Sequence, residues 1–475
     1  MMGLADDLIE LLGPDRVSVD PFALHLYSKD AGITHGRASV VVFPLSTEEV
    51  VGIVRIASRH GTPIVARGAG TGLAAGAVPS QGGVVVSTKL MDRIEEIDPN
   101  DRTAWVGPGV INLDLSVATS AYGLHFAPDP SSQAACTVGG NVANNSGGPH
   151  CLAEGSTVSH ILAVEVVLAD GEVMVLGGPA PDPIGLDLRG VMVGSEGTLG
   201  LVSRVLVRLV PDAPDVRTLL LAFDTVEAAA GTVSGVIAAG VVPAALEMMD
   251  QRMAIAVENW LGAGLPTDAA ALLLAEVVGE TAAVEAEADV IRRIAESQGV
   301  RSVKLAADEA ERGLLWKGRK SAFGAVAQAA PDYYLHDTVV PRTRLVETMS
   351  SVYEIADRHH LVMMNVFHAG DGNLHPLIAY DARDPEESGR VHAAAREMVE
   401  LCVKNGGTLS GEHGIGLEKR DLMPIMFTDV DLDAQARLKE CFDPHDLFNP
   451  AKVLPAGSRC FDLGGGKSHP DGVWV

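Results

Sequence analysis

The chain has 475 residues, too many for one hydrophobic core, which suggests two or three domains. Its formal net charge of −26 argues against a nucleic-acid partner, because phosphate binding requires a basic surface. The five scattered cysteines include no CxxC pair, which argues against a disulfide scaffold or metal cluster and fits a reducing cytoplasm. No apolar run reaches the roughly 20 residues that span a bilayer, so we expect any membrane contact to be peripheral.

Short strands and helices are predicted to alternate through the first half of the chain. The glycine-rich stretch 68–148 carries only brief strands, so we expect an ordered loop wrapped around a ligand. The pattern predicts, in chain order, a strand at 39–46, a helix at 46–61 opened by Ser46 and Thr47, a strand at 62–68, and a hairpin across Asp170-Gly171.

The composition changes near residue 213, where long Ala- and Glu-rich helices begin. These helices are expected at 225–240, 281–299 and 308–330, separated by strands. We therefore expect four segments: an N-terminal helix and arm at 1–38, a first domain at 39–213, a second domain at 214–430, and a C-terminal segment at 431–475 that returns to the first domain.

A strand runs into the first glycine-dense loop. Gly68, Gly70 and Gly72 allow sharp turns and can present consecutive N–H groups to a pyrophosphate. The stretch 70–75 also matches the GxGxxA pattern of a Rossmann fingerprint, but Pro79 interrupts the helix that such a loop needs. A tight structural turn without a ligand is the simpler alternative.

Two further glycine-rich loops favour a bound ligand. The run 128–148 combines a Gly-Gly step with three asparagines, whose amides can donate to and accept from flavin edges and ribose hydroxyls. The third loop is 194–200. Three such loops within about 130 residues would be costly strained backbone if no ligand were bound.

The run HAGDGNLH (368–375) reads as two strands around a turn. If Asp371-Gly372 is a two-residue turn, His368 lies directly opposite His375, with Cβ atoms roughly 5 Å apart. Two such imidazoles can share a metal ion, and Glu412 in the turn GEHGIG offers a third ligand. The alternative is that the two histidines only stack or hydrogen-bond.

Together, these motifs resemble the PCMH-type FAD-binding domain of the vanillyl-alcohol oxidase superfamily. The likeness extends from about residue 20 to 455 and includes LEMMD (246–250), the run 308–323 and PDYY (331–334). It is strongest to the flavin subunit of bacterial glycolate oxidase and to FAD-linked D-lactate dehydrogenases. The resemblance implies an α+β fold: a PCMH-type FAD-binding domain followed by a C-terminal α+β substrate (cap) domain with an antiparallel sheet and helices.

The resemblance also implies roles for individual residues. His368, His375 and Glu412 would bind a divalent metal, zinc or manganese. His413 would accept the hydroxyl proton, and Arg319 would pair bidentately with the substrate carboxylate, with Lys320 as the substitute if Arg319 points away. The expected cofactor-binding residues are Arg67, Gly68, Ala69, Gly70, Thr71, Gly72, Leu73, Pro128, Asp129, Ser131, Ser132, Thr137, Gly139, Gly140, Asn141, Ala143, Asn144, Ser146, Gly147, Glu196, Thr198, Gly200, Val202 and Asn449.

The implied activity is oxidation of a small D-2-hydroxy acid, D-lactate or glycolate, to the 2-keto acid. FAD is expected to be non-covalent, because the first loop has no histidine; Cys136 is the alternative anchor. Electrons would pass to an external acceptor: an electron-transfer flavoprotein, a cytochrome or quinone, or an iron–sulfur subunit. We expect a cytoplasmic protein, with peripheral contact to the inner membrane and a homodimer both compatible with the sequence.

Three other functions fit parts of the sequence. A D-2-hydroxyglutarate dehydrogenase would share the same core and differ only in its substrate pocket. A metal-dependent hydrolase would use the two histidines and Glu412 but leave the glycine loops unexplained. A flavin-binding subunit without catalytic function would leave the histidine hairpin unexplained.

Overall fold

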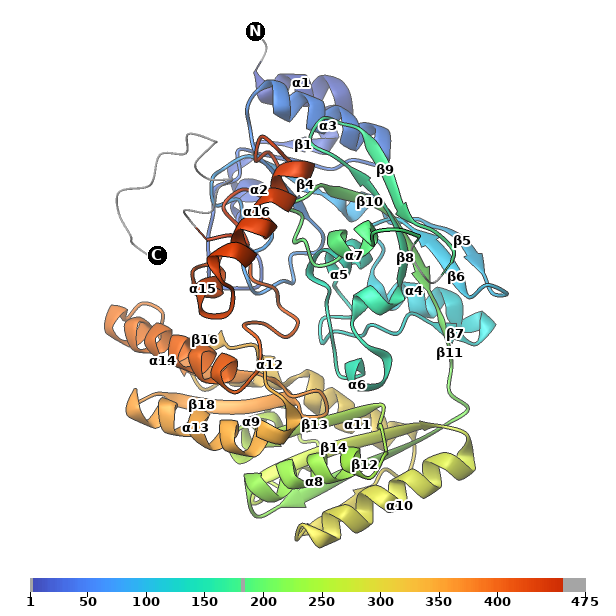
Figure 1. The fold of residues 1–475 in the computed structure, drawn as a ribbon, viewed down its shortest axis with the longest axis vertical. Helices are drawn as coiled ribbons and strands as arrows, with labels where there is room; N and C mark the ends of the chain where they lie inside the picture. The colour runs from blue at the N-terminus through green and yellow to red at the C-terminus, as the bar shows by residue number, and fades with distance from the viewer. Residues whose placement is uncertain (1–2, 181–183, 456–475) are drawn as a thin grey trace. The chain divides into compact units, whose positions relative to one another are not determined.

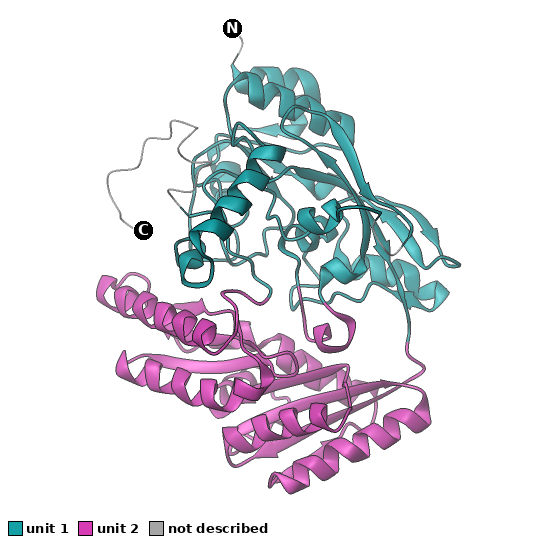
Figure 2. Cartoon of the chain, in the orientation of Figure 1, with its two compact units in different colours: residues 1–146, 156–212, 412–475 teal, residues 147–155, 213–411 magenta. Residues whose placement is uncertain are grey.

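The computed structural model describes residues 3–180 and 184–455. The chain forms two compact units, coloured separately in Figure 2. The first unit comprises residues 1–146, 156–212 and 412–475, and the second comprises 147–155 and 213–411. Residues 412–430, which we expected in the second domain, belong to the first unit. The physical reason is a main-chain bond within that unit, from Leu417 N to Ala74 O at 2.9 Å.

One sheet of the first unit contains the strand that leads into the first glycine loop. Its order is β1 (Val17–Ser18), β2 (Val40–Val42), β4 (Val84–Ser87) and β3 (Ile64–Arg67). Figure 1 labels β1 and β4 of this sheet. The last three strands are parallel, and the continuous valine runs of β2 and β4 suit burial on both faces. The predicted helix is confirmed as α3 (Thr47–Arg59), where the Ser46 hydroxyl accepts from Glu49 N. Helix α1 (Leu4–Leu12) precedes the sheet in the chain, and α2 (Pro21–Leu26) lies between β1 and β2.

A five-stranded antiparallel sheet completes the first unit. Its order is β5 (Ile94–Asp98), β6 (Thr103–Val106), β10 (Leu201–Arg208), β8 (Ile161–Val167) and β9 (Val173–Gly177). Val167 pairs with Val173, so the predicted hairpin is confirmed. The apolar residues of α4 (Asn112–Thr119) and α5 (Val138–Asn144) share one buried core with β8 and β10. The remaining elements are β7 (Leu124–His125), β11 (Val210–Pro211), α7 (Leu188–Met192), α15 (Met423–Met426) and α16 (Asp429–Phe442).

The second unit is built on one mixed-length antiparallel sheet. Its strands are β12 (Asp215–Phe223), β13 (Ala245–Asp250), β14 (Ala271–Gly279), β15 (Ser302–Leu305), β16 (Asp332–Leu335), β17 (Thr338–Val339), β18 (Val362–His368), β19 (Asn373–Leu374) and β20 (Pro376–Tyr380). The main path runs β15-β12-β14-β13-β18-β19-β17, and β20 pairs with β16 and β18.

Helices cover both faces of this sheet. Buried residues of α8 (Val226–Ala238), α10 (Thr281–Ser297) and α13 (Leu345–Arg358) share one core with alternate residues of β12, β13 and β14. Helix α11 (Glu309–Lys320) contacts the opposite face, where Trp316 and Arg319 reach carboxylates of the sheet. The other helices are α6 (Cys151–Glu154), α9 (Gln251–Leu261), α12 (Ala322–Val326) and α14 (Pro385–Lys404).

Candidate active site

The loop after β3 presents a row of backbone N–H donors. The chain runs from Gly68 to Gly72 without regular structure. Among the residues that the structure describes, none accepts a hydrogen bond from the backbone N–H groups of 68–72. Gly70 has a φ of +75°, which glycine adopts without steric cost. Consecutive N–H groups of this kind bind phosphate, so the loop fits the pyrophosphate of FAD.

The N-terminal arm supports this loop through Arg67. The Arg67 Nη1 atom donates to Lys29 O at 2.6 Å, and its guanidinium lies 5.2 Å from the centre of the Tyr27 ring. Burial raises the pKa of the neighbouring Asp30 to about 6, although the Gly32 N–H and Arg67 oppose this shift. In the described part of the chain, no group hydrogen-bonds to Asp30 Oδ2.

The second predicted loop enters helix α5. Thr137 caps this helix by accepting from Gly140 N at 3.2 Å. Asn141 has an internal role: its Oδ1 accepts from Asn112 at 2.9 Å, and its Nδ2 contacts the Cys136 sulfur at 3.5 Å. Cys136 is buried, and burial raises the pKa of its thiol. Asn141 therefore braces the loop from inside the protein.

The turn that carries His413 is fixed to the first unit by main-chain contacts. Asn144 Nδ2 donates to His413 O at 3.0 Å. The Glu196 carboxylate accepts from Ile415 N at 2.6 Å and from Gly416 N at 2.7 Å. Burial raises the pKa of Glu196, and the two N–H groups oppose that shift. Both oxygens of this residue, which we expected to bind the cofactor, thus hold the His413 turn.

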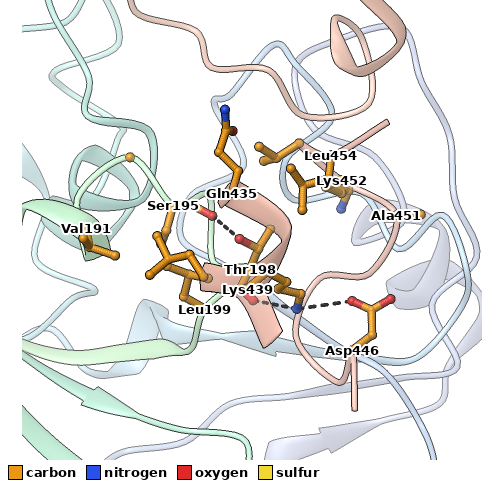
Figure 3. Close-up of a pocket in the computed structure, with 13 residues that line it drawn as sticks. Val191, Ser195, Thr198, Leu199, Gln435, Lys439, Asp446, Ala451, Lys452 and Leu454 are labelled. Carbon is orange, nitrogen blue, oxygen red and sulfur yellow. Dashed lines mark hydrogen bonds and ion pairs between the residues drawn. The ribbon is translucent and has the colours of Figure 1, made fainter. Parts of the chain in front are cut away.

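The third glycine loop and the C-terminal tail share a pocket within the first unit (Figure 3). Lys439 Nζ donates to Thr198 O at 2.7 Å, and the Thr198 hydroxyl donates to Ser195 O at 2.7 Å. The polar groups of Thr198 are therefore used inside the protein. The pocket is lined by Val191, Gly194, Ser195, Thr198, Leu199, Gln435, Leu438, Lys439, Asp446, Ala451, Lys452, Val453 and Leu454.

Asn449 joins the tail to the first glycine-rich segment. Its Nδ2 donates to Gly76 O at 2.8 Å and to Glu196 O at 2.7 Å. Lys452 Nζ also donates to Gly76 O, at 2.9 Å, and to Asn449 Oδ1 at 2.5 Å. Burial lowers the pKa of Lys452 to about 7. The side-chain amide of Asn449, another predicted cofactor ligand, thus ties three segments of the protein together.

The other predicted cofactor residues lie in or beside the same three loops. After β3 come Ala69, Thr71 and Leu73, and after β7 come Pro128, Asp129, Ser131 and Ser132. Helix α5 contains Gly139, Gly140 and Ala143 and is followed by Ser146 and Gly147. At the start of β10 are Gly200 and Val202.

The histidine hairpin has a different register from the one predicted. His368 pairs with Asn373, and Asn365 pairs with Pro376, so His375 lies two residues further along than expected. The connection is four residues long because neighbouring strands hold it: Gly370 N donates to Leu246 O, and Val340 N donates to Gly372 O. A shift of two residues keeps both histidines on one face. Their rings lie 5.1 Å apart, nearly perpendicular.

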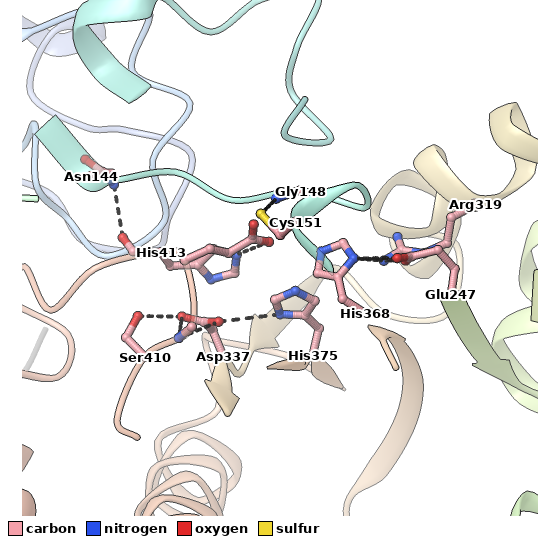
Figure 4. Close-up of polar contacts among 12 residues, drawn as sticks. Asn144, Gly148, Cys151, Glu247, Arg319, Asp337, His368, His375, Ser410 and His413 are labelled. Atoms are coloured by element: carbon pink, nitrogen blue, oxygen red, sulfur yellow. Dashed lines mark hydrogen bonds and ion pairs between the residues drawn. The ribbon is translucent and has the colours of Figure 1, made fainter. Parts of the chain in front are cut away.

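Glu247 lies between His368 and Arg319 in the second unit (Figure 4). It is the direct cross-strand partner of His368, and its Oε1 lies 2.8 Å from His368 Nδ1. Its Oε2 accepts from Arg319 Nε at 2.6 Å and pairs with Arg319 Nη2 at 2.6 Å. All three side chains are buried. Since Arg319 Nη2 is 3.4 Å from the same imidazole nitrogen, the closer carboxylate makes Nδ1 the protonated atom.

The contacts of Arg319 differ from the predicted bidentate pairing with a substrate. Two of its three nitrogens already bind Glu247. The third, Nη1, is buried and has no hydrogen-bond partner among the described residues. Arg319 therefore has one nitrogen left for a ligand.

Asp337 fixes the strand-side start of the GEHGIG turn. Its carboxylate accepts from the Ser410 hydroxyl at 2.6 Å and from Gly411 N at 3.0 Å. The same carboxylate lies 3.8 Å from His375 Nδ1. Glu412 is the next residue in the chain, and its carboxylate lies 3.9 Å from His413 Nε2. Glu412 therefore directly follows Gly411, whose N–H group is held by Asp337 in the second unit.

Glu247 and Asp337 are the residues that sequence reasoning missed. Both lie in buried and mainly apolar stretches, ALEMMD and LHDTVV, which also contain Asp250, His336 and Thr338. A buried carboxylate requires charged or hydrogen-bonding partners. An acidic residue within a predicted buried strand could therefore have been recognised as part of a polar site. The partners themselves are 72 and 74 residues away for Arg319 and Gly411, so the sequence could not identify them.

The glycine loop and the neighbouring α5 turn define a flavoprotein, and comparison with known proteins agrees. Residues 38–177 match the family model "FAD binding domain", and residues 213–453 match "FAD linked oxidases, C-terminal domain". The chain belongs to this family of FAD-linked oxidases. The family and the α+β fold class predicted from the sequence are thereby confirmed.

The chain resembles characterised relatives along most of its length. It is 44% identical to the glycolate oxidase subunit GlcD of Escherichia coli (strain K12), covering 91% of this chain and 87% of that protein. It is 39% identical to GlcD of Bacillus subtilis (96% and 97% covered) and 33% identical to a D-lactate dehydrogenase of Archaeoglobus fulgidus (87% and 91% covered).

Solved structures show the same fold at low sequence identity. Substrate-bound p-cresol methylhydroxylase matches with a TM-score of 0.81 at 18% identity, covering 95% of this chain and 96% of the other. The 4-ethylphenol oxidase from Gulosibacter chungangensis matches with a TM-score of 0.78 at 20% identity, covering 95% and 97%. These similarities support the fold alone.

Proposed function

We propose that this protein oxidises a small D-2-hydroxy acid, glycolate or D-lactate, to the 2-keto acid with bound FAD. The names of its relatives support this substrate class. The observation that carries the proposal is the bond from Asn144 Nδ2 to His413 O, at 3.0 Å. It joins the main chain of His413, whose imidazole is of the kind that usually accepts protons near neutral pH, to the helix of the second flavin loop.

FAD is held non-covalently in this proposal, with its pyrophosphate on the N–H groups of residues 68–72. When bound, FAD supplies the acceptor for the hydride that leaves Cα of the substrate. His413 accepts the proton of the 2-hydroxyl, so the substrate loses one hydride and one proton, and its alcohol carbon becomes the carbonyl of a 2-oxo acid. Arg319 Nη1 contacts the substrate carboxylate.

A divalent metal, Zn²⁺ or Mn²⁺, is the second cofactor that we propose. Its ligands are His368, His375 and Glu412. Two imidazoles on one sheet face and a carboxylate form the donor set of catalytic metal sites. Glu247 orients the ring of His368 through its contact with Nδ1, and in this proposal Nε2 is the ligand atom. When bound, the metal supplies charge that lowers the pKa of the substrate hydroxyl.

The electrons leave through an external acceptor. The term "subunit" in the GlcD names supports a protein partner, and we propose an electron-transfer flavoprotein, a cytochrome or quinone, or an iron–sulfur subunit. Among the described residues, no helix is both long and apolar enough to cross a membrane. We propose a cytoplasmic location, with any attachment to the inner membrane being peripheral.

The test is anaerobic reduction of the purified, yellow protein by a panel of D- and L-2-hydroxy acids. The flavin absorbance at about 450 nm should fall when D-lactate or glycolate is added. His413→Asn should keep the colour and slow bleaching by about 10²- to 10⁴-fold. His125→Asn, a half-exposed histidine paired with Asp212, is the matched control. Bleaching at the original rate in His413→Asn would contradict the assigned base; a colourless protein that takes up no FAD would contradict the whole proposal.

A further inference from the structure

Glu196 binds two consecutive backbone N–H groups just after His413. Its Oε1 accepts from Ile415 N at 2.6 Å, and its Oε2 accepts from Gly416 N at 2.7 Å. The side chain is buried, with 6% of the residue exposed. Charged acceptors form hydrogen bonds about twice as strong as neutral ones, so this carboxylate is a firm anchor for the turn.

The backbone of Glu196 is itself fixed to the second flavin loop. Glu196 N donates to Ala143 O at 2.8 Å, and Glu196 O accepts from Asn449 Nδ2 at 2.7 Å. Its φ of +53° is unusual for a residue with a side chain, and the surrounding contacts must maintain it. Because Asn144 follows Ala143 and donates to His413 O, one short helix holds both ends of the arrangement.

The glycines of the turn make room for the carboxylate. A Cβ atom on Gly414 would lie 2.7 Å from Glu196 Oε1, and one on Gly416 would lie 1.8 Å from Ala74 O. Both residues have positive φ, +88° and +50°. The glycine pattern of GEHGIG is therefore explained by close approach to Glu196 and to the first flavin loop.

We propose that Glu196 is a positioning residue, which holds the imidazole of His413 against the flavin loops by binding the N–H groups of Ile415 and Gly416. This inference rests on the proposed function, in which His413 is the base. It differs from the sequence-based expectation that Glu196 binds the cofactor, and the FAD affinity of a Glu196 variant distinguishes the two roles.

Glu196→Gln tests this role with little change in size. A glutamine can accept from one N–H group, but its own NH₂ group would then face the second N–H donor. We expect the rate of flavin reduction to fall about tenfold to hundredfold, because small misplacements of a reacting group cost about that much. FAD affinity should stay within about twofold. Glu165→Gln, which changes a partly buried carboxylate bound to Thr47 and Ser203, is the matched control.

A double variant separates positioning from a general structural effect. If Glu196 acts through His413, adding Glu196→Gln to His413→Asn should slow reduction no further. Full additivity of the two losses would overturn the proposal. A tenfold or larger loss of FAD affinity in Glu196→Gln would overturn it as well, because Glu196 would then be a flavin ligand.

Hydrogen exchange keeps the test independent of activity. In FAD-bound protein, the peptide amides of residues 414–417 should exchange faster in Glu196→Gln than in the wild type; unchanged exchange would overturn the anchoring role. If the wild type is reduced by no hydroxy acid but exchange still rises, the proposed function fails while the anchor stands. Gly414→Ala, which crowds the same carboxylate, should reproduce the slow reduction if Glu196→Gln does not fold.

Discussion

The two units prepare for ligands in opposite ways. In the first unit, no residue of the described chain accepts from the backbone N–H groups of the loop 68–72, and in our proposal these groups bind the pyrophosphate of FAD. In the second unit, the charged side chains of Glu247, Arg319 and His368 are buried and bonded to one another before any ligand arrives. The loop of the first unit therefore depends on its backbone conformation. The cluster of the second unit depends on the balance of charge among its buried side chains.

Removing the central charge of the second unit should have the largest effect. Glu247→Ala leaves the fully buried Arg319 without its counter-ion, which typically costs about 3–5 kcal/mol. We expect a corresponding fall in the free energy of unfolding of the second unit, measured by urea denaturation.

Two further variants sharpen this prediction. Glu247→Gln keeps the volume and one acceptor, so its loss should be smaller than that of Glu247→Ala. Glu354→Ala, on the exposed side of α13, should change stability by less than about 0.5 kcal/mol. If Glu247→Ala is no less stable than Glu354→Ala, the second unit does not depend on this charge balance.

In the first unit, Asp30 should make stability depend on pH. Burial raises its pKa from 3.8 to about 6, so the folded state binds more protons than the unfolded state between these values. Stability should therefore fall as pH rises from 4 to 6, by at most about 3 kcal/mol, and stay lower above pH 6. Asp30→Asn should lack this loss.

The measurement is the difference between the urea midpoints of Asp30→Asn and the wild type at pH 4 and pH 7.5, with saturating FAD. Titratable groups that the two proteins share contribute equally to both midpoints, so their contributions cancel in this difference. The variant should gain on the wild type at the higher pH. An equal difference at both pH values would mean that Asp30 is not held in an unfavourable ionised state.

Crowding the flavin loop should have the smallest effect. A Cβ atom on Gly68 would lie 2.2 Å from Thr137 Oγ1, which caps α5, so Gly68→Ala must displace this hydroxyl. Loss of such a cap costs about 1 kcal/mol, and we expect FAD affinity to fall about fivefold to tenfold. Gly178→Ala is the control, because nothing lies within 4 Å of its added methyl group. Equal affinities, measured by flavin fluorescence titration, would contradict the backbone model of the first unit.

The sequence predicted the family and the fold class correctly, and it proposed three flavin loops from signals that are local. Gly68, Gly70 and Gly72 indicate backbone that must turn sharply, whatever lies elsewhere in the chain. The metal ligands and the base remain predictions.

The hairpin register and the exact partners depend on distant residues. The connection 369–372 is four residues long because Leu246 and Val340 bind it, and neither contact can be read from the hairpin itself. Glu196 and Asn449 were recognised as parts of the site, but their partners come from segments more than 200 residues away. Sequence spacing finds such residues without revealing whether they contact a ligand or another part of the protein.

The dependence of the first unit on residues 412–452 has a consequence for synthesis. Phe448 bridges to Ile64 at the edge of β3, and Asn449 and Lys452 bind the carbonyl of Gly76. On the ribosome, the N-terminal strands emerge several hundred residues before these partners. The first unit therefore lacks its contacts with residues 412–452 until the whole second unit has been translated. We expect FAD to bind tightly only after synthesis of the C-terminal segment.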